Sequence, residues 1–156
     1  MSELLSVKKV AEWFLSQRSM EHKVLQKLCY YTQAWHCALE GQVLFSDRIE
    51  AWVHGPVIPV LYQQYKGYGW QKIPQVKDFD ESGFSSGTLE VLRAVYDTYG
   101  DLTGMQLENL THSEVPWQKA RGELYPSKPL EICTNEIQEQ DMREYYLKLY
   151  ENSQDD

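Results

Sequence analysis

The sequence predicts a mainly α-helical, compact domain of about six helices around a long central helix, with a small β element. One observation is a stripe of apolar side chains at helical spacing along the longest helical segment: Met20, Val24, Leu28, Tyr31, Trp35 and Ala38. A second is that a neighbouring flank of that segment is also low in polarity: Leu25, Cys29, Thr32 and His36. The third is a length of 156 residues with 42% hydrophobic side chains, which suits one core.

Two helices are expected in the first forty residues. Ser6 can cap a helix that runs to about Arg18. The longest helix follows, from about Ser19 to Glu40, and Gly41 is placed to end it. Because two flanks of this second helix carry few polar side chains, we expect other elements to cover it on more than one side.

The small β element is expected between residues 43 and 53. Residues 43–45 and 49–53 are short extended runs, and Ser46-Asp47 forms the turn between them. Gly55-Pro56 then breaks the second run, because a proline biases the preceding residue away from helical conformation. Pro59 suits the first turn of a helix, and residues 71–87 read as a surface loop in which residues 73–76 are a candidate strand.

Three further helices and a helical turn are expected in the second half. The first contains Leu89, Leu92, Tyr96 and Tyr99 and is ended by Gly100; the second starts in a Thr103–Gln106 capping box and runs to about His112. A short helical turn holds Pro116 and Trp117, and residues 122–134 are irregular. The last helix, capped by Asn135 and Gln138, runs to about Tyr150 with Met142, Tyr146 and Leu149 facing inward. We assign residues 1–150 to a single domain and residues 151–156 to a flexible acidic tail.

Composition narrows the classes of function. The net charge is −8, concentrated toward the C-terminus, and there is no basic stripe, so nucleic-acid binding is not expected. The acidic C-terminal part would suit a basic protein partner. No apolar run approaches the ~18 residues of a membrane span. Three cysteines without C-x-x-C spacing, and the lack of a signal peptide, predict a cytoplasmic protein.

No motif for catalysis, metal or cofactor binding stands out, and we expect no enzyme, no metal and no cofactor. The four histidines form no H-E-x-x-H pattern. An enzyme of hydrolase type that uses His36, His54 or His112 with a cysteine or a carboxylate, such as Cys37 with His112, stays open as an alternative. A carboxylate pair of Asp47 and Glu50 is also possible in principle.

His112 ends a predicted helix and has two interpretations. In one, a protonated imidazole complements the helix dipole and bonds a carbonyl or Glu114. In the other, it is a general base or a partner contact. Trp52 and His54 likewise either pack inward or form a binding rim beside the Gly-Pro corner.

Two blocks of sequence resemble the signature of the Panacea domain family, the SocA-like antitoxins long labelled phage-associated proteins. The first block is KLCYYTQAWH at 27–36, Leu44-Phe45 with Asp47, IEAWVHGPV at 49–57 and the residues that follow to Tyr65-Lys66. The second is Leu107, LTHSE at 110–114 and Pro116-Trp117. The shared residues that we expect to be structural are Lys27, Tyr30, Tyr31, Trp35, Glu50, Ala51, Thr111, His112 and Trp117.

The resemblance implies a mostly helical domain that neutralises a toxin by direct protein–protein contact. It implies a toxin encoded by a neighbouring gene and, in one branch of the family, an adaptor that delivers the toxin to a ClpXP-type protease. A phage-encoded regulator that binds host machinery is a further alternative. Aromatic side chains often dominate protein interfaces, so we expect the partner-binding residues to be Trp52, His54, Gly55, Pro56, Tyr62, Tyr68 and Trp70.

Overall fold

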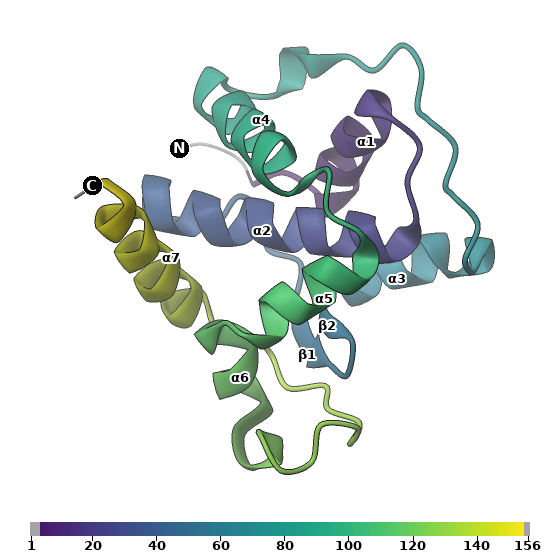
Figure 1. Ribbon diagram of the computed structural model, residues 1–156. Coiled ribbons are helices and arrows are strands. Elements are labelled where there is room, and N and C mark those ends of the chain that lie inside the picture. Colours follow the sequence, from purple (N-terminus) through teal and green to yellow (C-terminus); the bar gives the residue numbers. More distant parts are fainter. Residues whose placement is uncertain (1–3, 155–156) are drawn as a thin grey trace.

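The computed structural model describes residues 4–154 and confirms a mainly α-helical fold with one small sheet (Figure 1). Within these residues there are seven α-helices, one more than expected: α1 (Val7–Gln17), α2 (His22–Glu40), α3 (Pro59–Tyr65), α4 (Ser86–Tyr99), α5 (Gly104–His112), α6 (Val115–Arg121) and α7 (Glu139–Gln154). The two strands are β1 (Glu50–Trp52) and β2 (Gly55–Val57). Three short 3₁₀ turns are η1 (Lys66–Tyr68), η2 (Glu81–Gly83) and η3 (Gly122–Leu124).

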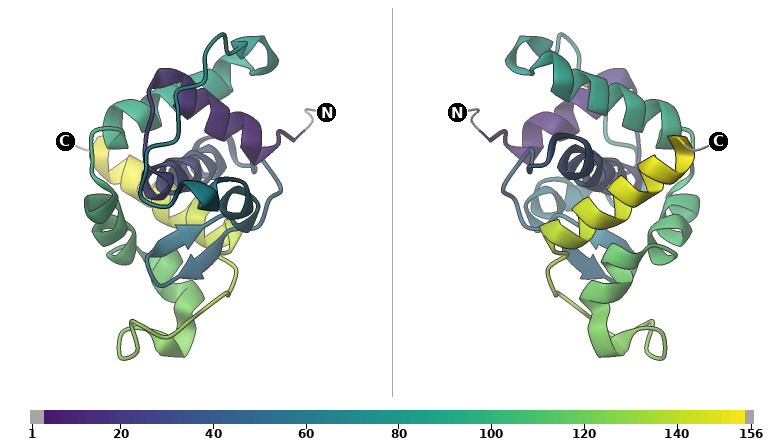
Figure 2. Two further views of the ribbon diagram at one scale, coloured as in Figure 1. Left: turned by 90° about the vertical axis from the view of Figure 1, so that its right-hand side faces the viewer. Right: turned by 90° about the vertical axis from the view of Figure 1, so that its left-hand side faces the viewer.

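Helix α2 is the centre of the fold, as the double apolar flank predicts. Fifteen of its nineteen residues are buried, and Gly41 ends it in the left-handed conformation. In Figure 2, where α2 is seen nearly end-on, α1, α3, α4 and α7 surround it. A helix enclosed in this way must pair its buried polar side chains inside the protein.

Two buried glutamines on α2 bind loop backbone, and one of them explains why residues 43–45 are not a strand. Gln33 Oε1 accepts hydrogen bonds from the N–H groups of Leu44 (2.8 Å) and Phe45 (3.3 Å), and Gln33 Nε2 donates to the Phe45 carbonyl (2.6 Å). The backbone groups that a strand partner would use therefore go to a side chain. The prediction of a strand here is wrong; only an isolated bridge to Leu5 remains.

The β element is instead a hairpin in which β1 pairs with β2 across a turn at Val53-His54. The prediction that Gly55-Pro56 breaks the run is therefore wrong, since both residues lie in β2. Pro56 is tolerated because its partner, Ala51, uses other groups: its N–H donates to the Asn135 carbonyl and its carbonyl accepts from Arg121. The N–H group that proline lacks is not required at this position.

Local signals are confirmed at the starts of α1 and α5 but at neither end of α7. Ser6 caps α1 and Thr103 with Gln106 forms the capping box of α5. Asn135 does not cap α7, since its side chain donates to the Ala120 carbonyl and α7 begins at Glu139. Helix α7 continues to Gln154, past the expected end at Tyr150; residues 155–156 of the expected tail lie outside the described residues.

Two smaller expectations, one in α7 and one in the loop after η1, are wrong. Leu149 of α7 is 40% exposed and does not face inward, whereas Met142 and Tyr146 are buried. Residues 73–76 form no strand: Ile73 makes one isolated bridge to Met20. None of the helices in the described range is long and apolar enough to cross a membrane.

Candidate partner-binding cleft

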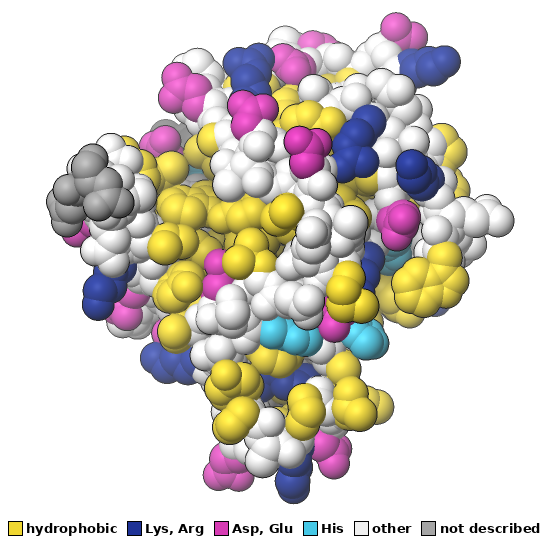
Figure 3. Space-filling view, viewed as in Figure 1, with side chains coloured by type: hydrophobic (Ala, Val, Ile, Leu, Met, Phe, Trp, Pro, Cys, Tyr) yellow, Lys and Arg dark blue, Asp and Glu magenta, His cyan; other side chains and the backbone are white. Residues whose placement is uncertain are grey.

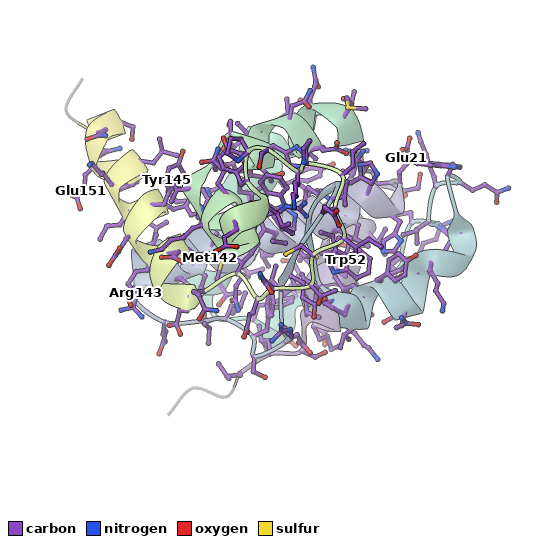
Figure 4. All side chains as sticks on the ribbon, turned by 90° about the horizontal axis from the view of Figure 1, so that it is seen from below. Glu21, Trp52, Met142, Arg143, Tyr145 and Glu151 are labelled. Atoms are coloured by element: carbon purple, nitrogen blue, oxygen red, sulfur yellow. The ribbon has the colours of Figure 1, made fainter. Side chains whose placement is uncertain are left out.

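A cleft of about 470 Å³ lies where the start of α2, the hairpin and the end of α3 meet. We call it the Trp52 cleft and define it by Glu21, Lys23, Lys27, Trp52, Tyr62 and Trp70, all of which line it. Four residues of the predicted partner-binding set line it: Trp52, His54, Tyr62 and Trp70. Figure 4 shows Trp52 and Glu21 on one side of the molecule and α7, with Met142 and Tyr145, on the other.

Trp52 is half-buried and held in a defined orientation. Its indole N–H donates to Glu50 Oε1 at 2.8 Å, and its ring meets Tyr62 edge-on with a centroid distance of 5.0 Å. The other carboxylate oxygen of Glu50 accepts from Arg48 Nε at 2.7 Å. Glu50 is thus a positioning residue that aims the tryptophan, which agrees with its expected structural role.

The rim of the cleft is exposed and carries both aromatic and charged groups. Trp70, which lines the cleft, is 85% exposed, whereas Tyr68 is 38% exposed and does not line it. His54 is also exposed, and its Nδ1 lies 3.1 Å from Glu108 Oε1, which is bound by Lys23 Nζ as well. Burial raises the pKa of Glu108, but hydrogen bonds from Lys23 and His54 outweigh it and hold that pKa below the usual range. Glu108 is therefore ionised and committed to these two partners.

The base of the cleft contains Lys27, whose side chain lies against Gly55. A Cβ atom at Gly55 would lie 2.9 Å from Lys27 Cε and 2.9 Å from Thr111 Oγ1, and the φ of Gly55 is +109°. Glycine is required here by both space and backbone conformation. Gly55 and Pro56 are buried, so they shape the cleft and do not present a surface.

The remaining shared residues of α2 lie in the core. Tyr31 donates to Glu114 Oε1 at 2.7 Å and Tyr146 donates to the same atom at 2.8 Å, while Tyr30 and Tyr146 share a hydrogen bond of 3.0 Å. Trp35 Nε1 donates to the Tyr99 hydroxyl. These contacts join α2 to α4, α6 and α7, which accounts for the tyrosine-rich motif as part of the core.

His112 stacks on Trp117 with a centroid distance of 4.0 Å. The Arg121 guanidinium also lies over the Trp117 ring, 5.2 Å from its centroid. Burial lowers the pKa of His112. The expected bond of His112 to the backbone is present, at Val53, but its expected bond to Glu114 is absent because Glu114 binds two tyrosines, and burial disfavours the charged imidazole. The Trp117 indole donates to the Trp52 carbonyl at 2.9 Å, so the stack supports the hairpin.

The groups named for an enzyme are mostly apart or buried. Cys29 and Cys37 are fully buried, and burial raises the pKa of the Cys37 thiol to about 12. His36 Nδ1 binds the Gln42 carbonyl, and Asp47 accepts from the Val7 N–H at the start of α1 while Glu50 binds Trp52. Among the described residues no group of three potential ligands could hold a metal ion. His54 with Glu108 is the pair within hydrogen-bond reach at the cleft.

Several residues that line or support the cleft were missed from the sequence. Lys23, Lys66 and Glu21 line the cleft but resemble ordinary surface charges in sequence. Arg121 is 1% exposed and donates to Ala51 and Glu131 carbonyls, although it follows a short helix like any solvated arginine. Gln26, which belongs to neither apolar flank of α2, gave no signal either, although its buried carboxamide binds the backbone of Ile58.

A comparison with protein-family models finds a match over residues 25–118 to the antitoxin SocA-like, Panacea domain family. No curated protein matches the chain, and no solved structure matches it. The matched range runs from α2 to the middle of α6 and includes Lys27, Trp52, Tyr62 and Trp70 of the cleft. Since it covers more than half of the 156 residues, the chain belongs to the antitoxin SocA-like, Panacea domain family.

Proposed function

We propose that this protein is an antitoxin that neutralises a protein toxin by covering part of its surface, and that the Trp52 cleft is the contact site. Membership of an antitoxin family supports a toxin partner. The observation that carries the choice of site is the pair of aromatic anchors: an oriented, half-buried Trp52 beside a Trp70 that is 85% exposed. A tryptophan left in water costs free energy that a partner can recover by burying it.

A second apolar region is a weaker candidate. In Figure 3 hydrophobic side chains gather over α2 between α4 and α7, where a groove of about 190 Å³ is lined by Trp35, Leu39, Val91 and Tyr150. This groove is smaller than the Trp52 cleft and lies partly outside the range that matches the family, since α7 begins at Glu139. The cleft therefore has the stronger claim.

The experiment is co-expression of the chain with the product of the neighbouring gene, scored by growth and by co-purification. The wild-type chain is expected to restore growth and to co-purify. Trp70→Ala should reduce both growth and co-purification, because it removes an aromatic contact with the toxin. The fold should be unaffected, since the Trp70 ring is exposed. Ile132→Ala is a matched control, since Ile132 is equally exposed at 85% and does not line the cleft. A neighbour product that is not toxic, or full rescue by Trp70→Ala, contradicts the proposal.

Delivery of the toxin to a ClpXP-type protease is a finer part of the proposal, suggested by the family resemblance. The toxin's half-life, measured with and without the antitoxin in cells that have or lack the protease, tests it. A half-life that does not change with the antitoxin means that neutralisation proceeds by binding alone.

One observation favours a second candidate function. His54 and Glu108 form a histidine–carboxylate pair 3.1 Å apart at the cleft, which is the arrangement of a general base with its orienting group. His54→Gln keeps a polar side chain but removes the base. If this variant still co-purifies with the toxin but no longer restores growth, catalysis is favoured; restored growth rejects it.

A further inference from the structure

Lys27 is a buried cation without a partner in the described part of the chain. Its residue is 2% exposed, it lines the Trp52 cleft, and no hydrogen bond or ion pair of its Nζ occurs among residues 4–154. Burial without a counter-ion disfavours an ammonium group strongly. The fold therefore places an amine where its protonated form is disfavoured.

The carboxylate closest to serving as counter-ion is already occupied. Glu108 Oε1 lies 2.5 Å from Lys23 Nζ and 3.1 Å from His54 Nδ1. It affects Lys27 through space, as a weaker influence than burial and than the repulsion from Lys23. The charge of Lys27 is left to be met from outside the chain.

The lysine cannot simply turn away to solvent. Gly55 closes over its stem, with the space that a Cβ would take already filled by Lys27 Cε and Thr111 Oγ1. The strand β2 and helix α5 thus fix the side chain at the base of the cleft. A group held by two elements in this way is preorganised for a ligand.

The surroundings identify the chemistry of that ligand. Three lysines (Lys23, Lys27 and Lys66) line the cleft with one glutamate, Glu21, although the whole chain has a net charge of −8. None of the described lining residues is arginine, the side chain whose fork suits phosphate best. Trp52, Tyr62 and Val57 add apolar walls. A single negative charge next to an apolar group fits this site.

We infer that the Trp52 cleft receives a carboxylate of the toxin, carried beside an apolar side chain, and that Lys27 is its counter-ion. This inference rests on the proposed toxin contact at the cleft. The carboxylate belongs either to an aspartate or glutamate side chain or to the C-terminus of the toxin. Both sources present the same monoanion to Lys27.

The first test compares Lys27→Met with Lys8→Met in binding to the purified product of the neighbouring gene. Lys8 is exposed on α1 and does not line the cleft, so it is a matched loss of one positive charge. Lys27→Met should weaken binding about 10–100-fold, the value of one charge-assisted hydrogen bond, while Lys8→Met changes it less than about threefold. Thermal unfolding of both variants confirms that they are folded.

The second test locates the carboxylate on the toxin and does not depend on the folding of any Lys27 variant. Each exposed aspartate and glutamate of the toxin is changed to its amide, and separately the toxin is extended by two residues at its C-terminus. One of these changes should weaken binding to the wild-type antitoxin but leave binding to Lys27→Met unaltered, as a double-mutant cycle requires. Coupling to a side chain or to the C-terminus identifies the source.

The outcomes separate this inference from the proposed function. If Trp70→Ala weakens binding but Lys27→Met does not, or if no toxin carboxylate couples to Lys27, the inference is wrong while the toxin contact at the cleft stands. If neither Trp70→Ala nor Lys27→Met weakens binding, the inference and the proposed function both name the wrong contact site. If the wild-type chain does not bind the neighbour's product, the proposed function itself fails.

Discussion

Lys27 and Gly55 lie against each other at the base of the cleft, and their contact affects both stability and the proposed binding. The lysine is nearly inaccessible to water, and the glycine leaves the space in which its stem lies. Desolvation, aided by repulsion from Lys23, lowers the pKa of Lys27 from 10.5 to about 7. The proposed role in binding a toxin carboxylate would account for a shared residue whose charge weakens the fold, where the sequence alone predicts a structural role.

Replacing this lysine should stabilise the isolated protein. The folded pKa lies below the unfolded one, so the unfolded chain binds the proton more tightly between about pH 7 and 10.5. The penalty is therefore largest at and below pH 7 and fades as the pH rises to about 10. Lys27→Met should raise the free energy of unfolding at pH 7 by about 1–3 kcal/mol in urea denaturation. Lys8→Met is the control, and a clear loss of stability in Lys27→Met would contradict the expectation.

Gly55→Ala should lower the free energy of unfolding by about 1–3 kcal/mol. The added methyl group enters space held by Lys27 and Thr111, and the backbone there has a φ of +109°. Gly67→Ala serves as a comparison, because no atom lies within 4 Å of its Cβ position and its φ is not positive. Equal melting temperatures for the two variants would show that β2 can move away from α2.

At the scale of elements, the hairpin is the part most dependent on distant residues. Its two short strands are too small to be stable alone. Ala51 is bound by Asn135 and Arg121, and Trp52 is bound through its carbonyl by Trp117. Trp117, Arg121 and Asn135, which all come after α5 in the sequence, therefore hold the hairpin that forms one wall of the cleft.

Arg121→Met should disrupt this support. The guanidinium donates from Nη1 to the Ala51 carbonyl at 3.1 Å and from Nη2 to the Glu131 carbonyl at 2.7 Å. Its loss leaves buried carbonyls unpaired, so we expect a decrease of about 2–4 kcal/mol in the free energy of unfolding. Hydrogen exchange should quicken in residues 122–134 first. Arg93→Met, which removes an exposed pair with Glu81, should change stability by less than about 0.5 kcal/mol.

For the whole molecule, the ring-rich core depends on one buried carboxylate. Glu114 is 4% exposed and joins α6 to α2 and α7 through the hydroxyls of Tyr31 and Tyr146. Burial raises the pKa of Glu114 to about 7, against hydrogen bonds from both tyrosines that lower it. The core therefore has a group that titrates near neutral pH.

Glu114→Gln should remove a pH dependence of stability. The folded pKa of about 7 exceeds the ordinary value of 4.5, so the folded state binds more protons between these values and wild-type stability falls as the pH rises through this window. The difference in unfolding free energy, wild type minus variant, should fall by about 1–3 kcal/mol from pH 4.5 to 7.5. His22, whose pKa is lowered by burial to about 4, acts in the opposite direction but is present in both proteins.

Chemical denaturation at several pH values measures this difference. Glu90→Gln on the exposed face of α4 is the control and should show no such trend. A difference that stays constant with pH would mean that Glu114 is ionised throughout.

The placement of the acidic C-terminal part also belongs to this scale. Charge along the sequence suggested that it helps to contact a basic partner. In the structure α7 packs on α2 at the side opposite the Trp52 cleft, and the cleft itself is rich in lysine. The proposed contact therefore has the charge opposite to that of the whole chain.

Helices were predictable because periodicity and caps act between residues close in sequence. The α2 stripe, the Ser6 cap, the Thr103–Gln106 capping box and the Gly41 end needed no tertiary information. The sequence by itself determined a mainly helical fold, the identity of its central helix and, through two spaced motifs, its family. It also placed Trp52, Tyr62 and Trp70 on one short stretch.

Tertiary structure decided where the chain departs from local preference. Residues 43–45 form no strand because Gln33 binds their backbone, and Pro56 fits in β2 because Asn135 and Arg121 bind the N–H and carbonyl groups of its partner Ala51. It also decided that Lys27 is buried under Gly55 and that Glu108, eighty-one positions later, is engaged by other partners. Burial and pairing between distant segments have no signature in local sequence, because each depends on where the whole chain brings those segments together.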